Sequence, residues 1–114
     1  MSGRRGLAAA ALLGALLASG CQDDRFPNLS PAAKAGWEVF RVNCLLCHMD
    51  PQKDSPVGPA LAGSSLELLR AKVLEARYPP GYQPKRPGPI TMPVQPQVAS
   101  KLESIAAFLA EVGR

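Results

Sequence analysis

The stretch Cys44-Leu45-Leu46-Cys47-His48 determines how the rest of this 114-residue chain is interpreted. Its two thiols lie three residues apart, so one helical turn places them on the same side. The histidine that follows them is the only one in the sequence. Two thiols at this spacing can reach two vinyl groups on one edge of a porphyrin, and the next residue then presents its imidazole to the iron. The spacing therefore predicts one covalently attached haem, linked through Cys44 and Cys47, with His48 as an iron ligand.

Two other kinds of site use the same residue types. A structural zinc site needs four ligands, and this cluster offers three with no second pair downstream. A thioredoxin-like dithiol requires a βαβ context, which the surrounding sequence lacks. The residues therefore favour haem attachment over both alternatives.

The second axial ligand is expected to be a methionine, because the chain has no second histidine. Met1 lies in the leader, and Met49 adjoins His48 and cannot reach the opposite face of the haem. Met92 lies in the stretch 79–96, which contains seven prolines. A stiff loop loses less entropy when it holds a weak sulfur ligand against iron. Met92 is the expected ligand, and the alternative is a core methionine beside an iron with an open position.

Hydrophobic periodicity predicts an all-α fold with three helices joined by loops. A first helix starts at the Ser30-Pro31 pair and runs to about Asn43. A second opens at a capping box formed by Ser64 and Glu67. The third spans 98–112.

The same periodicity predicts which side chains of each helix face inward. The expected positions are Ala32, Gly36, Val39 and Phe40 in the first helix, Leu66, Leu69, Val73 and Ala76 in the second, and Val98, Leu102, Ile105, Leu109 and Val112 in the third.

The start of the chain has the features of an export signal. Arg4 and Arg5 precede the short apolar run 7–19, which is too short to span a bilayer as a helix. The stretch Leu17-Ala18-Ser19-Gly20-Cys21 resembles a bacterial lipoprotein box, which implies that Cys21 is acylated and becomes the first mature residue. The alternative is an ordinary secreted protein with a free thiol. The expected organisation is a signal peptide at 1–20, a flexible tether at 21–30 and one folded domain at 31–114.

Composition excludes several classes. The 5% aromatic content, without long alternating β-branched runs, disfavours an all-β sandwich, and 12 prolines exclude a continuous helical bundle. Loss of residues 1–20 lowers the formal charge from +4 to +2. The basic character is therefore no argument for a nucleic-acid partner.

Further motifs show a resemblance to a family. Gly36 and Phe40 have a Gly-x-x-x-aromatic spacing, and Val57-Gly58-Pro59-Ala60-Leu61-Ala62-Gly63 contains Gly-Pro-x-Leu-x-Gly. The stretch 105–109 has an Ala-aromatic-Leu pattern. With the attachment motif, these features resemble the small class I c-type cytochromes over residues 31 to 112.

The resemblance implies a cytochrome c fold, with three main helices and a proline-rich methionine loop around one haem. It also implies that the Pro59 carbonyl accepts a hydrogen bond from the His48 ring. Gly36 would let the first and last helices cross closely, with Phe40 and Phe108 packed at the crossing. Trp37 is expected in the core.

Tyr78, Tyr82, Lys85 and Arg86 are expected to be exposed loop residues, although each could pair with a haem propionate.

An iron held by both His48 and Met92 has no vacant position, so the expected function is single-electron transfer and not enzymatic catalysis. The protein is expected to be a monomer, anchored by a lipid on Cys21 to the periplasmic side of a bacterial membrane. It would relay electrons between a donor and an acceptor redox protein. The alternatives are a haem enzyme or gas sensor with an open distal position, and a haem subunit of a larger oxidase or reductase.

Overall fold

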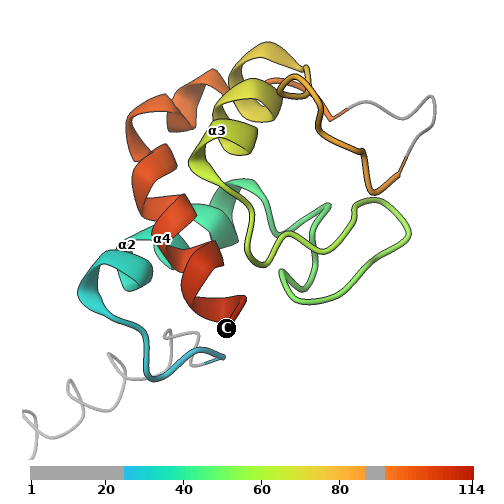
Figure 1. The fold of residues 1–114 in the computed structure, drawn as a ribbon. Helices are drawn as coiled ribbons and strands as arrows, with labels where there is room; N and C mark the ends of the chain where they lie inside the picture. Colours follow the sequence, from blue (N-terminus) through green and yellow to red (C-terminus); the bar gives the residue numbers. More distant parts are fainter. Residues whose placement is uncertain (1–24, 87–91) are drawn as a thin grey trace, which may run out of the picture.

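The computed structural model describes residues 25–86 and 92–114, and these form helices and loops without a strand. In chain order the elements are α2 (Pro31–Asn43), α3 (Leu66–Leu69), the π-helical turn η1 (Arg70–Leu74), the 3-10 helix η2 (Pro96–Lys101) and α4 (Leu102–Val112). In Figure 1 the helices gather on one side of the molecule and the long loops lie on the other. The prediction of an all-α protein is confirmed.

The export signal and the proposed acylation site, Cys21, lie outside the described residues. Across 25–86 and 92–114, the structure contains no helix that is both long and apolar enough to cross a membrane.

Helix α2 begins where the sequence predicts. The Ser30 hydroxyl accepts a hydrogen bond from the Ala33 amide at 3.2 Å, which satisfies one of the unpaired donors of the first turn. The buried face differs from the prediction, because Ala32 is exposed and Val39 only half-buried. The inward face is Ala33, Gly36, Trp37 and Phe40. Burying the large Trp37 turns the helix so that Ala33, one turn earlier, points inward in place of Ala32.

Helices α2 and α4 form the most extensive contact between elements. A Cβ atom at Gly36 would lie 1.9 Å from the Ser104 carbonyl oxygen and 2.9 Å from Phe108 Cβ. Phe40 and Phe108 are fully buried, with ring centroids 5.4 Å apart. Burial of such a side chain stabilises the fold by roughly 1.5–3 kcal/mol. The expected close crossing is confirmed.

The packed part of the chain extends further toward the N-terminus than the expected boundary at residue 31. Phe26 lies edge-on to Trp37 and Phe108, with centroid distances of 5.0 and 5.3 Å. Leu29 also packs against the core. Residues 25–30, expected as part of a flexible tether, therefore lie against the helix crossing.

The second helical segment differs from the prediction in its start. Its N-cap is Ser65, whose hydroxyl accepts from the Leu68 amide at 3.1 Å. The prediction of a capping box formed by Ser64 and Glu67 is wrong. The Ser64 amide instead donates a hydrogen bond to the Leu61 carbonyl in a turn. The chain is therefore not yet helical at Ser64.

The end of this segment also differs. The α-helix gives way to η1 after one turn. Ala76 follows η1 with φ +53° and is exposed, so its predicted place on the inward face is wrong. A non-glycine residue in this left-handed region ends the helix at a conformational cost.

The C-terminal segment matches its prediction. All five periodic positions are buried, the first in η2 and the others in α4: Val98, Leu102, Ile105, Leu109 and Val112. Leu102, Ile105 and Leu109 lie in the same core cluster as Phe40 and Phe108. In Figure 1 this segment lies with the other helices, on the side of the molecule opposite the long loops.

A carboxylate at the surface ties α4 to the start of α2. Glu111 accepts hydrogen bonds from the Ser30 amide at 2.8 Å and the Ser30 hydroxyl at 2.7 Å. The hydroxyl bond, then the amide bond, lower the pKa of Glu111 below its usual value. A carboxyl with a lowered pKa stabilises the fold at pH values above its unfolded-state pKa, and this contribution disappears as the pH falls through the folded-state pKa.

We therefore expect Glu111→Gln to reduce the loss of stability on acidification. Denaturant unfolding of the haem-loaded protein at neutral and acidic pH would measure this difference. Ser30→Ala should also reduce the loss of stability on acidification. The variant with both substitutions should show the same pH dependence as Glu111→Gln alone. Additive effects of the two substitutions on the pH dependence would contradict this account.

Candidate haem site

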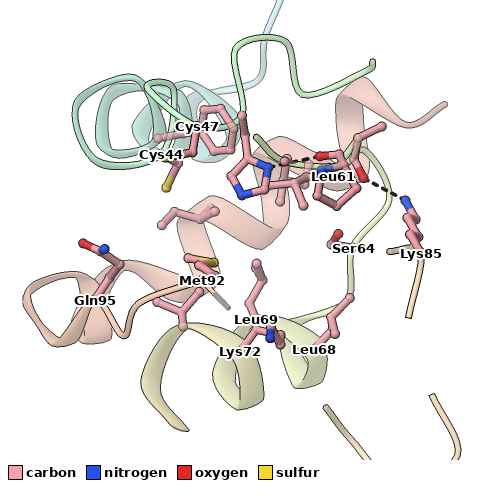
Figure 2. Close-up of a pocket in the computed structure, with 18 of the residues that line it drawn as sticks. Cys44, Cys47, Leu61, Ser64, Leu68, Leu69, Lys72, Lys85, Met92 and Gln95 are labelled. Carbon is pink, nitrogen blue, oxygen red and sulfur yellow. Dashed lines mark hydrogen bonds between the residues drawn. The ribbon is translucent and has the colours of Figure 1, made fainter. Parts of the chain in front are cut away.

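The four residues expected at the site lie around one cavity of about 390 Å³. Cys44, Cys47, His48 and Met92 all line it, although His48 and Met92 are 44 positions apart in the chain. Figure 2 shows Cys44 and Cys47 on one side of the cavity and Leu68 and Leu69 of α3 on the other. The fold therefore brings the expected ligands together from two distant segments.

The lining combines an aliphatic interior with basic side chains. The apolar contributors include Phe40, Val57, Leu61, Leu68, Leu69, Val73, Val98, Ile105 and Leu109. Lys72, Lys85 and Arg86 also line the cavity, as do two tyrosines, and none of the described lining residues is an aspartate or glutamate. This chemistry suits a large apolar ligand that carries negative groups at one edge.

His48 is buried, with 7% of its surface exposed. Its Nδ1 lies 3.0 Å from the Pro59 carbonyl oxygen, as the family resemblance implies. A carbonyl only accepts, so Nδ1 carries the proton and Nε2 of the neutral ring keeps its lone pair. Burial lowers the pKa of His48, and the positive charge of Arg86 acts in the same direction. The hydrogen bond to Pro59 raises this pKa but does not outweigh burial. The imidazole is thereby held as a neutral ring in which Nε2 is free to donate its lone pair.

The segment beside the imidazole needs a glycine. A Cβ atom at Gly58 would lie 2.6 Å from both Cε1 and Nδ1 of His48. The Ser55 hydroxyl donates to the Cys47 carbonyl at 2.9 Å and accepts from the Gly58 amide at 3.1 Å. These contacts hold residues 55–59 against the ring. The sequence analysis used the Gly58-Pro59 dipeptide only for the family resemblance and did not predict that Gly58 lies against the His48 ring.

The two cysteines have different environments. Both are free thiols, with Cys44 half-buried and Cys47 exposed. Burial, with a smaller contribution from Cys47, raises the pKa of the Cys44 thiol to about 11. The Cys44 side chain is therefore a neutral thiol at physiological pH.

The segment that carries Met92 is fixed by η1. Gln95 lies three residues after Met92, and its amide donates to the Val73 carbonyl at 2.7 Å. Met92 itself is half-buried against the core. In Figure 2 it lies on the Leu69 side of Cys44 and Cys47. The π-helical turn thus provides the attachment point for the end of the methionine loop.

The four loop residues expected to be exposed lie at the cavity, and Tyr82 is half-buried there. Tyr78, Tyr82, Lys85 and Arg86 all line the cavity. Tyr78 and Tyr82 stack with centroids 5.3 Å apart, and the Lys72 amine lies 4.2 Å from the centre of the Tyr78 ring. Sequence reasoning did not identify Lys72, and no local motif distinguishes it from other surface lysines. The four loop residues and Lys72 form the cationic and phenolic part of the lining.

The residues present fit a covalently bound haem. The two thiols, the imidazole and the thioether all border an aliphatic interior that could hold the macrocycle. The basic side chains of the lining could pair with its two negatively charged propionates. Among residues 25–86 and 92–114, no group of three or more His, Cys, Asp or Glu side chains is arranged to hold a metal ion directly. Comparison of the chain with family models, curated proteins and solved structures gave no match, so the residues of this cavity are the basis for a function.

Proposed function

We propose that the protein is a lipid-anchored c-type cytochrome with one covalently bound haem. It carries single electrons between redox proteins outside the cytoplasmic membrane. The observation that carries the proposal is the meeting of Cys44, Cys47, His48 and Met92 at one apolar cavity. For residues 31–114 we propose the fold of the small class I c-type cytochromes.

Each of the four residues has a defined part. Cys44 and Cys47 would hold the haem through thioether bonds, each made by adding S–H across a vinyl group. His48 would donate the lone pair of Nε2, and Met92 its sulfur, as the two axial ligands. When bound, the haem supplies an iron that accepts and releases one electron.

The surrounding residues control how this site behaves. The Pro59 carbonyl keeps the His48 proton on Nδ1 and strengthens the ligand. The aliphatic lining would keep water from the haem, and the Met92 thioether would favour the reduced state of the iron, so both would raise the reduction potential. Two protein ligands leave no position for a substrate, which supports electron transfer over an enzymatic reaction.

The anchor completes the proposal. Cys21 would carry the lipid after removal of residues 1–20 and would hold the domain at the periplasmic side of a bacterial membrane. With Cys21 acylated and Cys44 and Cys47 in thioethers, every cysteine of the chain is used. No thiol is then left to oxidise in an exported protein.

The test of the proposal is covalent haem loading. The full chain would be produced in a bacterium that can export it and attach haem, and the denatured product analysed by mass and visible absorption. Because addition of S–H to a vinyl group loses no atom, the mass should rise by that of one whole haem.

Matched variants locate the bonds. Cys44→Ser and Cys47→Ser should each retain one thioether at most, and the double variant should release all haem on denaturation. Met49→Leu is a control in the same segment and should load normally. A wild-type protein that carries no covalent haem in a host shown to mature other c-type cytochromes would contradict the proposal.

A further inference from the structure

Three aliphatic side chains lie on the surface beside the attachment motif. Val42, Leu46 and Met49 are 72%, 90% and 58% exposed. They are spaced i, i+4 and i+7, and the amides of Cys44 and His48 each donate to the carbonyl four residues earlier. This near-helical backbone places the three side chains on one side, which we call the apolar stripe. None of these three described residues lines the cavity, so a ligand bound there would not cover the stripe.

The N-terminal segment enters the folded domain next to the apolar stripe. The Arg25 guanidinium donates to the Met49 carbonyl at 3.4 Å and lies 5.0 Å from the centre of the Trp37 ring. Phe26 then packs edge-on to Trp37 and Phe108. These contacts fix the entry point of the chain beside Met49.

The distance from this entry point to the proposed lipid is short. Three residues separate Arg25 from Cys21. Four Cα–Cα steps span at most about 14 Å even when fully extended. An acyl anchor on Cys21 would therefore keep the Cα atom of Arg25 within that distance of the acylated residue. The guanidinium of Arg25 contacts Met49, so the stripe would also lie near the lipid surface.

The charges near the stripe permit close approach to lipid. Glu38 pairs with Arg41 at 2.6 Å, and Asp50 pairs with Lys53 at 3.9 Å. Glu38, four residues before Val42, and Asp50, next to Met49, are thus each balanced by a cation. The positive charge of Arg25 is offset by Asp23 and Asp24, which precede it in the chain. Contact of this surface with lipid therefore depends on the apolar side chains and the anchor, and not on an excess of positive charge.

We propose that the apolar stripe lies in the interface of a phospholipid bilayer, so that the domain rests on the membrane with its attachment-motif side toward the lipid. This inference rests on the acyl anchor in the proposed function. Aliphatic side chains on one side of a helical segment, flanked by basic residues, are the arrangement that binds in the interfacial plane of a membrane. The occupant of the stripe is the lipid itself.

Thiol labelling tests this orientation. In the acylated, haem-loaded protein no native thiol remains, so a cysteine introduced at one position reacts alone. Val42→Cys reports on the stripe. The matched control is Glu67→Cys at an exposed position of α3, the helix whose Leu68 and Leu69 lie across the cavity from Cys44 and Cys47 (Figure 2). Each variant would be treated with a charged, water-soluble maleimide, in detergent and on vesicles of phosphatidylcholine and phosphatidylglycerol.

We expect vesicles to slow labelling at position 42 by about tenfold or more, because transfer into lipid suppresses the reactive thiolate, and to leave position 67 unchanged. Leu46→Asp, which keeps the anchor but places a charge in the stripe, should restore fast labelling at position 42. Met49→Asp provides the same test if Leu46→Asp does not load haem.

Failure of the inference is separable from failure of the proposed function. The mass of the purified protein reports acylation and haem before any labelling. In protein that carries both, equal labelling rates at position 42 in detergent and on vesicles would overturn the membrane orientation. Slow labelling at position 42 in native membranes but not on lipid vesicles would mean that a membrane protein covers the stripe. That result would also overturn the proposal that lipid covers it.

Discussion

Replacing Met92 by alanine is expected to open the iron of the haem-loaded protein to carbon monoxide. Among the described residues that line the cavity, Met92 carries the only methionine sulfur, and alanine has no atom that can replace it. The ferrous variant should therefore bind carbon monoxide rapidly and completely. Its reduction potential should fall by an appreciable part of the roughly 0.8 V range over which axial ligands set haem potentials.

Met49→Ala is the matched control for this substitution. Met49 is 58% exposed and adjoins His48, and it does not line the cavity. This variant should keep the wild-type visible spectrum, potential and resistance to carbon monoxide. An unchanged spectrum in Met92→Ala would remove Met92 as the ligand.

A single methyl group at Gly36 is expected to prevent stable packing of the two long helices. The added Cβ would lie 1.9 Å from the Ser104 carbonyl oxygen, which belongs to the backbone of α4 and cannot rotate away. Helix propensity alone would favour alanine over glycine by about 1 kcal/mol. We expect Gly36→Ala nevertheless to lower the free energy of unfolding by about 3 kcal/mol, the upper end of the usual cost of overpacking.

Denaturant unfolding of the haem-loaded variant would measure this change. Ala35→Val adds bulk at the exposed neighbouring position of α2 and should cost less than about 1 kcal/mol. A Gly36→Ala protein as stable as the wild type would contradict the close crossing.

The parts of the fold that depend on local sequence pattern could be predicted. The five periodic positions from Val98 to Val112 are all buried, because apolar residues at helical spacing have one side on which to pack. Ser30 caps its helix through its own side chain. The contact between His48 and Pro59 was implied by the family resemblance, since residues eleven apart in a loop have no periodicity from which to derive it.

The errors come from contacts between distant segments. Gly63 donates to the Leu109 carbonyl at 2.7 Å, which holds the chain in a turn and moves the helix start from Ser64 to Ser65. Phe26 lies in a polar stretch without helical pattern, and only its packing on Trp37 shows that the segment belongs to the core.

The candidate site shows the same division. Cys44, Cys47, His48 and Met92 could be predicted to lie together because their chemistry is specific and the chain offers few alternatives. Lys72 could not, because its place beside Tyr78 depends on where η1 and the proline-rich loop meet.

The most direct test of the central claim is the visible spectrum of the ferrous, haem-loaded wild-type protein before and after addition of carbon monoxide. If His48 and Met92 occupy both axial positions, the spectrum should be that of a six-coordinate low-spin haem and should remain unchanged. Rapid and complete binding of carbon monoxide by the wild type would contradict the electron-carrier account and favour a haem enzyme or gas sensor.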